Sequence, residues 1–418
     1  MTETASGADP LSWVREFSPI LSTLAAQYRE TTPLSDQYVA VSAPMTPHTG
    51  LFVETLAAAG ATVGVSGEPG STHRDVVAHL ESLPSVTTFS TAGMDGAELK
   101  EAQRELLGER PDLIADDGSF LLSLVHDEFP ALAESVVGGC EQTTGGITRL
   151  SAMDDQDVLS FPVYGVNETP MKDTFDNVHG TAESSISNLV SITNTMIGGK
   201  TAVVVGYGRC GRGIATKLRD LGADTVVTEV DPRRALAAIA DGHRVTELAD
   251  AVGDADYVIT ATGRYDVVRR EHLEAMADDA ILTSIGSFIE IDVDALATLA
   301  TGVSSPTPGI DRYTLPDGRT INLVTEGKVV NLSGPASAGN PSEVMDTTFA
   351  MMSAALVDLV ADGRTLEAGL HQVPDRLDRR IAEMKLDSLE VTIDEVTESQ
   401  RSYHREWAGH EGVDSAEE

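Results

Sequence analysis

Residues 203–213 read VVVGYGRCGRG, and this stretch decides the fold of the second half of the chain. Gly206, Gly208 and Gly211 have the spacing GxGxxG, directly after a run of valines and at the start of a helical pattern. Glycines in this context allow a tight turn, close approach of a ligand to the backbone, and close packing of helix on strand. The stretch therefore predicts a Rossmann-type βαβ unit that binds a dinucleotide.

The next apolar run indicates which dinucleotide is bound. The run TVVTEV carries Glu229, 23 residues after Gly206. A carboxylate at this place accepts a hydrogen bond from a ribose 2′-hydroxyl and repels a 2′-phosphate, which predicts NAD as the cofactor. Arg233 and Arg234 follow closely and keep NADP open as the alternative, because a nearby guanidinium accommodates that phosphate.

The rhythm of apolar runs extends this unit into a two-lobed α/β protein. Runs such as TAVVVG, YVITAT and AILTSIG alternate with helical stretches over 200–330, and YVAVSA, ATVGVSG and LIADDG do so over 36–136, with a helix at 50–59. A helical pattern at 184–197 connects the two, and the helical residues after 340 return to the first lobe. We expect a Rossmann NAD-binding domain at 181–335 and a discontinuous α/β substrate domain made of 1–180 and 336–418.

Composition sets the surroundings of the protein. The 418 residues carry 66 acidic against 29 basic side chains, a net charge of -37, and only six of the cations are lysines. Such a surface repels phosphates, which excludes nucleic acid and anionic membranes as partners, and it is typical of a salt-loving cytosol. No window reads as a membrane span and the first residues do not read as a secretory signal, so we expect a cytoplasmic protein. Two cysteines predict neither a disulfide framework nor a metal site.

Polar side chains gather at three places in the first lobe. Asp116 and Asp117 follow an apolar run, residues 140–146 read CEQTTGG, and Lys172 precedes Asp176 by four residues. Each admits two interpretations. The paired acids cap a helix or form a site, the CEQTTGG loop is a capped turn or a ligand clamp, and the Lys–Asp pair is a surface ion pair or a shared contact to a substrate hydroxyl.

The second lobe offers a matching edge. Ligands of such sheets lie at the carboxyl ends of the strands, which here are residues 260–263, residues 285–287 and the region of Asn331.

Longer motifs resemble the S-adenosylhomocysteine hydrolase (adenosylhomocysteinase) family, particularly its short archaeal form. They are VNETPMKDTFDNVHGTAESSISNL, which leads into the glycine stretch, then VVTEVDPRRAL, EGKVVNLSGPASAGNPSEVMDTTF and SQRSYHREW. The resemblance covers most of the chain. It implies a homotetrameric enzyme of the methyl cycle in which bound NAD oxidises the 3′-hydroxyl of S-adenosylhomocysteine, a base removes the C4′ proton, homocysteine leaves, water adds, and the ketone is reduced again.

The resemblance also implies roles for single residues. Lys172 and Asp176 engage the 3′-hydroxyl, Glu141 binds the ribose hydroxyls, and Asp117 handles the C4′ proton. The substrate-binding positions it implies are Thr46, Ser71, Asn167 and Met345. The NAD-binding positions are Thr143, Thr144, Asn177, Gly206, Gly208, Gly211, Glu229, Ile285 and Asn331.

Three histidines of the family are replaced, by Pro44, Ser287 and Asn340. Gln142 stands where the family has threonine, and the family's DDGGD is DDGSF here. These replacements predict retained recognition of NAD and nucleoside with altered catalysis. His48 and His73 lie close to the altered loops, but their spacing is that of surface histidines.

Three hypotheses follow. The first is hydrolysis of S-adenosylhomocysteine, slowed by the missing histidines. The second is a divergent paralogue that binds NAD and a nucleoside or thioether, and either oxidises another substrate or serves as a sensor. The third, ranked last because the KDTFDN segment would then have no role, is a D-2-hydroxyacid dehydrogenase.

Overall fold

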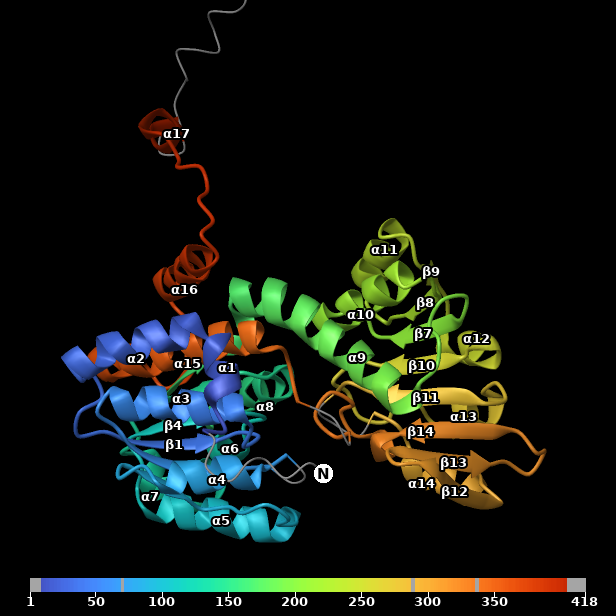
Figure 1. Ribbon diagram of the computed structural model, residues 1–418, viewed down its shortest axis with the longest axis horizontal. Helices are drawn as coiled ribbons and strands as arrows, with labels where there is room; N and C mark the ends of the chain where they lie inside the picture. The colour runs from blue at the N-terminus through green and yellow to red at the C-terminus, as the bar shows by residue number, and fades with distance from the viewer. Residues whose placement is uncertain (1–8, 69–70, 287–289, 335–337, 404–418) are drawn as a thin grey trace, which may run out of the picture.

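The computed structural model describes residues 9–68, 71–286, 290–334 and 338–403. It has two lobes, each built on one sheet with helices on both faces (Figure 1). The helical run η2 (Lys172–Gly180) and α9 (Thr181–Thr193) leads from the first lobe into the second, and the chain returns to the first lobe before α15 (Ser342–Asp362). The prediction of a two-lobed α/β protein with a Rossmann domain is confirmed. The exact domain boundaries stay a prediction.

The first sheet has the order β15-β6-β5-β4-β1-β2-β3, and all its strand pairs are parallel. Val39 and Val41 of β1 pack into one core, while Ala40 between them packs into the core on the other face. Short apolar strands covered on both faces are what a parallel sheet requires. Its strands are β1 (Tyr38–Ser42), β2 (Thr62–Ser66), β3 (Val86–Thr88), β4 (Leu113–Asp116), β5 (Gly138–Glu141), β6 (Pro162–Gly165) and β15 (Gly369–Gln372).

The second sheet has the order β12-β13-β14-β11-β10-β7-β8-β9 and is parallel except for the pairs that β13 makes. In β7 the side chain of Val204 packs on one face, and those of Val203 and Val205 pack on the other. Its strands are β7 (Thr201–Val205), β8 (Asp224–Thr228), β9 (Arg244–Val245), β10 (Tyr257–Thr260), β11 (Ala280–Ser284), β12 (Gly302–Thr307), β13 (Ile310–Thr314) and β14 (Thr320–Val324).

The helices cover the faces of these sheets and join their strands. Those of the first lobe are α1 (Ser12–Glu16), α2 (Pro19–Thr31), α3 (Pro47–Ala58), α4 (Arg74–Glu81), α5 (Gly96–Gly108), α6 (Phe120–Glu128), α7 (Pro130–Ala133), α8 (Thr144–Asp154), η1 (Val166–Glu168), α15, η5 (Gly363–Thr365) and α16 (Asp375–Ser388). Those of the second are α10 (Arg209–Asp220), α11 (Pro232–Ala240), α12 (Leu248–Ala251), η3 (Val252–Asp254), α13 (Arg270–Ala275), α14 (Val293–Leu299) and η4 (Thr325–Gly327). α17 (Glu398–Tyr403) lies beyond α16 and projects from the body (Figure 1).

One helix corrects an expectation about membranes. By length and composition alone, the 21 residues of α15 suffice to cross a bilayer, although the sequence was expected to hold no such window. In the fold, 78% of its most apolar window is buried inside the protein. Phe349 of α15 stacks on Phe52 of α3, with ring centroids 4.8 Å apart. The helix is thus apolar all round because it forms the core of the first lobe.

Candidate active site

The carboxyl edge of the first sheet carries the paired acids. Ser42, Asp116 and Glu141 end neighbouring strands in register. Asp116 is fully buried and accepts hydrogen bonds from the backbone N–H of Leu122 (2.8 Å) and of Asp117 (3.0 Å). Burial raises the pKa of Asp116 to about 7. Of the two interpretations, helix capping is correct for Asp116, which holds the first turn of α6.

Glu141 is the centre of a second set of contacts. Its carboxylate accepts five hydrogen bonds of 2.7–3.0 Å, from the backbone of Gly118, from the backbone and hydroxyl of Ser119, and from the backbone and hydroxyl of Thr143. Burial raises the pKa of Glu141, and the donated bonds oppose that rise because they stabilise the ionised form. A methyl group on Gly146 would come within 2.2 Å of this carboxyl carbon, so the loop needs its glycine. Thr143 also caps α8, so the loop serves as a capped turn built around the Glu141 carboxyl group.

Asp117 differs from Asp116 because it is only partly buried. Its carboxylate accepts one side-chain hydrogen bond, from Nε2 of Gln142 at 2.6 Å. Burial raises the pKa of Asp117 to about 6, while the bond from Gln142 and the charge of Lys172 lower it. A carboxylate that titrates close to neutral pH is suited to accept a proton and to return it. No local sequence pattern links Gln142 to Asp117, because the two are 25 residues apart.

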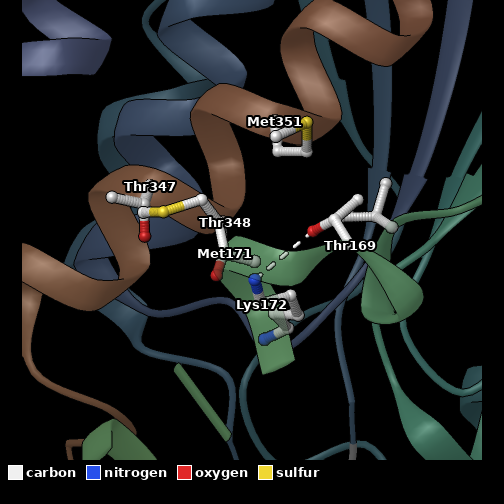
Figure 2. A pocket seen from close by; sticks show the side chains of 7 residues that line it. Thr169, Met171, Lys172, Thr347, Thr348 and Met351 are labelled. Carbon is white, nitrogen blue, oxygen red and sulfur yellow. Dashed lines mark hydrogen bonds between the residues drawn. The ribbon is translucent and has the colours of Figure 1, made fainter. Parts of the chain in front are cut away.

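Lys172 and Asp176 lie one turn apart in η2, which has the wide turns of a π-helix. Such segments are rare and frequently mark functional sites. Both side chains are buried and paired, Lys172 being 9% exposed and Asp176 fully buried, so the surface ion pair is the wrong interpretation. Asp176 also accepts a 2.6 Å hydrogen bond from the hydroxyl of Thr348 in α15. Figure 2 shows a small cavity beside Lys172, lined by Thr169, Met171 and residues of α15, with the Lys172 backbone held by the Thr169 hydroxyl at 3.3 Å.

Asn340 joins the Lys172–Asp176 pair to the second lobe. Its Nδ2 donates to Oδ1 of Asp176 at 2.6 Å, and its Oδ1 accepts from Asn331 (3.0 Å) and from the Ser184 hydroxyl (2.9 Å). The Asn340 amide therefore has four partners, since Nδ2 also approaches the Thr181 hydroxyl at 3.3 Å. Oδ1 of Asn331 is itself buried and has no partner among the described residues.

A second chain of amides leads toward the CEQTTGG loop. Nδ2 of Asn177 donates to Oδ1 of Asn167 at 3.1 Å, and Nδ2 of Asn167 donates to the hydroxyl of Thr144 at 3.1 Å. Arg209, at the start of α10, donates to the Asn167 carbonyl (3.2 Å) and pairs with Glu168 (2.7 Å) and Asp173 (2.7 Å). The first turn of the dinucleotide helix is thereby clamped beside η2.

The glycine stretch has the geometry of a dinucleotide loop. Gly206 has φ +97°, which favours glycine, and a methyl group on Gly211 would lie 2.1 Å from the Gly206 carbonyl oxygen. Glu229 lies at the end of β8, and its carboxylate accepts a 2.7 Å hydrogen bond from the Tyr207 backbone within that loop. Arg233 is paired to Asp231 at 2.7 Å and points to solvent with 89% of its side chain exposed. The hydroxyls of Thr260 and Ser284, at neighbouring strand ends, are buried without partners among the described residues.

The remaining expected positions lie at the edge of the first lobe, except Ile285, which lies in the second lobe. Thr46 is buried at the start of α3, Met345 is partly buried beside the main core, Ser71 is half-exposed, and Ile285 is buried after β11. The Pro44 carbonyl accepts hydrogen bonds from the Thr46 backbone (2.8 Å) and the Thr49 hydroxyl (2.5 Å). Ser287 lies outside the described residues.

His48 corrects the sequence interpretation. It is 8% exposed, and its Nε2 lies 2.9 Å from the hydroxyl of Ser342 at the start of α15. Burial lowers the pKa of His48 to about 4, so the ring is neutral at physiological pH. The sequence could not reveal this, because α15 is almost 300 residues away. His73 is exposed, as expected.

Comparisons with known proteins agree with this geometry. The family model described as S-adenosyl-L-homocysteine hydrolase matches residues 3–131, and that of the S-adenosyl-L-homocysteine hydrolase NAD binding domain matches residues 177–337. Over 404 residues the chain is 40% identical to the S-inosyl-L-homocysteine hydrolase of Methanopyrus kandleri, covering 96% of this chain and 95% of that protein. It is also 40% identical over 404 residues to adenosylhomocysteinases of Haloquadratum walsbyi (96% and 94% covered) and Thermotoga maritima (96% and 99%).

The chain belongs to the S-adenosyl-L-homocysteine hydrolase family. Its cofactor is NAD, as the glycine stretch and Glu229 predict. The structure itself fits this cofactor, since the loop at Gly206 and Gly211 admits a close backbone approach, and the buried oxygens of Asn331 and Ser284 have no partner among the described residues. Membership in this family overturns the hydroxyacid dehydrogenase hypothesis.

Proposed function

We propose that this chain hydrolyses S-adenosylhomocysteine, or a nucleosyl-homocysteine thioether of the same build, to a nucleoside and homocysteine. The observation that carries the proposal is the buried Lys172–Asp176 pair, which is bonded through Asn340 to the second lobe and lies beside the dinucleotide helix. A structural ion pair needs no such connection to two lobes. A site that must hold a ribose between substrate groups and a cofactor does need it.

The cofactor would be held by the loop at Gly206, Gly208 and Gly211, with Glu229 on a ribose and Asn331, Asn177 and Thr144 toward the reacting end. When bound, NAD supplies the reversible oxidation of the substrate's 3′-hydroxyl to a ketone, which acidifies the neighbouring C4′ proton. In this step the amine of Lys172 takes the proton of the 3′-hydroxyl, and Asp176, held by the Thr348 hydroxyl, fixes the resulting ammonium in place.

In this proposal, the acids of the first sheet bind the ribose and move the C4′ proton. The carboxyl oxygens of Glu141 are fixed in place by five donors, so in this proposal they bind the ribose hydroxyls. Asp117 accepts the C4′ proton, since its raised pKa keeps it a competent base near neutral pH. Departure of the thiol and addition of water at C5′ complete the hydrolysis, and Asp117 returns the proton to C4′.

The replaced histidines argue for a slowed hydrolysis. Loss of a general acid or base typically costs on the order of 10² to 10⁴ in rate. Asn340 has no titratable proton, and Pro44 has no donor, so neither can replace an imidazole. A divergent paralogue that binds NAD and nucleoside without cleaving the thioether is the alternative that these positions favour. We further propose a homotetramer, which the family resemblance implies, in the cytoplasm of a salt-loving organism, which the acidic composition supports.

The base of the nucleoside is a second open choice. Relatives named for S-inosyl- and for S-adenosyl-homocysteine share the same identity with this chain. Competition between the two thioethers for the purified protein, in high salt, tests it. A hydrolase of the proposed kind releases thiol from at least one of them, and the absence of thiol from both would favour the divergent paralogue.

A further inference from the structure

A fourth carboxyl group adjoins the acids of the first sheet. Glu68 lies two residues after the end of β2, the strand beside β1 at this edge. Its carbonyl accepts hydrogen bonds from the Thr72 hydroxyl (3.1 Å) and the Ser71 backbone (3.3 Å), and the preceding Gly67 N–H donates to the Ser90 hydroxyl at 2.6 Å. The turn that carries Glu68 is therefore fixed at both sides.

The four acids differ in what they receive. Glu141 accepts five hydrogen bonds, Asp116 accepts two from the backbone, and Asp117 accepts one from Gln142. The Glu68 carboxyl group accepts none from the described residues. Donated hydrogen bonds stabilise the ionised form, so where several acids crowd one edge, the proton goes to the member with the fewest donors. That member is Glu68.

The electrostatic surroundings agree with this ranking. Burial, followed by the charges of Asp117, Asp116 and Glu141, raises the pKa of Glu68 well above its usual range. Near Asp117 the charged groups also include Lys172 and Asp176. Gln142, the partner of Asp117, is 5% exposed. Its Oε1 atom is buried and lacks a partner among the described residues. An unpaired buried acceptor costs free energy, and it points to a ligand group that completes the site.

We propose that Glu68, as a carboxylic acid, protonates the departing sulfur of the substrate and so replaces the acid that the altered histidine positions cannot provide. The inference rests on the proposed function. Starting from the 3′-ketonucleoside, Asp117 takes the C4′ proton, the electron pair forms the C4′–C5′ double bond, and the C5′–S bond breaks with its electrons on sulfur. Glu68 gives its proton to that sulfur, which yields a neutral thiol and the Glu68 carboxylate. In hydration, this carboxylate takes a proton from the water whose oxygen adds at C5′, and Asp117 returns its proton to C4′.

The test compares Glu68→Gln and Glu68→Asp with wild type on two thioethers. One is S-adenosylhomocysteine, whose alkyl thiolate is a poor leaving group. The other is a 5′-(nitrophenylthio) nucleoside, whose arylthiolate leaves without a proton. Nicotinamide absorbance with adenosine reports 3′-oxidation separately, and it shows that each variant is folded and holds cofactor. Glu105→Gln, an exposed acid on α5, is the matched control.

We expect Glu68→Gln to slow thiol release from S-adenosylhomocysteine by about 10² or more, with the loss shrinking to below about tenfold for the arylthio substrate. Glu68→Asp should regain part of the rate, and 3′-oxidation should stay within about threefold of wild type. An equal loss of thiol-release rate on both thioethers, or no loss on either, would overturn the role of Glu68 and leave the proposed function intact. A wild-type protein that releases thiol from neither thioether would instead overturn the proposed function.

Discussion

The carboxyl edges of the two sheets carry different groups and have different proposed roles. At the second sheet, the positions proposed for the cofactor are the glycine loop at Gly206, the amide of Asn331, and the Glu229 carboxylate, which accepts a hydrogen bond from the loop backbone. At the first sheet, the same edge holds Asp116, Asp117 and Glu141, all with pKa values raised by burial. A cofactor that stays bound throughout a reaction needs a surface that fits it. The breaking of substrate bonds instead needs side chains that exchange protons.

The largest effect is expected where the two edges meet. Lys172→Met removes the ammonium that contacts both Asp176 and the substrate in the proposed mechanism. We expect 3′-oxidation of adenosine to fall by about 10³, because a general acid–base group typically contributes 10² to 10⁴. Nicotinamide absorbance after addition of adenosine measures it. Lys217→Met on α10, where the lysine pairs with Glu183 at 34% exposure, is the control and should leave the rate unchanged.

A change at the second sheet should affect the binding of NAD alone. In Gly211→Ala, the new methyl group would lie 2.1 Å from the Gly206 carbonyl, so the loop must open. Overpacking of this kind costs about 1–3 kcal/mol, which corresponds to an affinity for NAD up to about 10²-fold weaker. Calorimetric titration with NAD checks this. Gly302→Ala, where a methyl group meets nothing within 4 Å, should bind as wild type does, and equal affinities for both variants would contradict the assigned loop.

His48 sharpens the comparison through pH. Its pKa is lowered to about 4 in the fold from 6.5 in the unfolded chain, so the unfolded state binds more protons between these values. The stability contributed by the neutral ring is complete above pH 6.5 and is lost as pH falls toward 4. At pH 5 the loss is about 2 kcal/mol. In denaturant unfolding, wild type should lose about 2 kcal/mol more stability than His48→Gln between pH 7.5 and pH 5, because the buried acids titrate equally in both proteins. The exposed His73→Gln should lose as much as wild type.

The smallest effect is expected at the bridge between the lobes. Asn340→Ala removes the amide that links Asp176 to Asn331, at a typical net cost of about 1 kcal/mol for one hydrogen bond. Roughly fivefold slower 3′-oxidation is expected, with NAD affinity nearly unchanged. A large loss of NAD affinity in this variant would instead place Asn340 on the cofactor side.

The sequence predicts the features that depend on local signals and misses those that depend on contacts between distant residues. The glycine stretch, Glu229 and the valine-rich strands are local signals, and the structure places them as expected. The connecting helix was predicted at 184–197 but spans Thr181–Thr193, because Asn194 adopts the left-handed conformation (φ +50°) and ends it. The partners of Asp176 and His48 come from α15, more than 150 residues away, and no local pattern encodes such contacts. The π-helical turns around Lys172 and the return of β15 to the first sheet likewise depend on tertiary packing.

One incubation tests the central claim most directly. Purified protein in high salt is mixed with S-adenosylhomocysteine while free thiol and nicotinamide absorbance are followed together. We expect transient formation of reduced nicotinamide, together with a thiol release that is slow but proportional to the amount of protein. Reduced nicotinamide without any thiol would mean that oxidation survives and cleavage does not. The absence of both signals from protein that binds NAD would contradict the assignment of Lys172 and Asp176 to the 3′-hydroxyl.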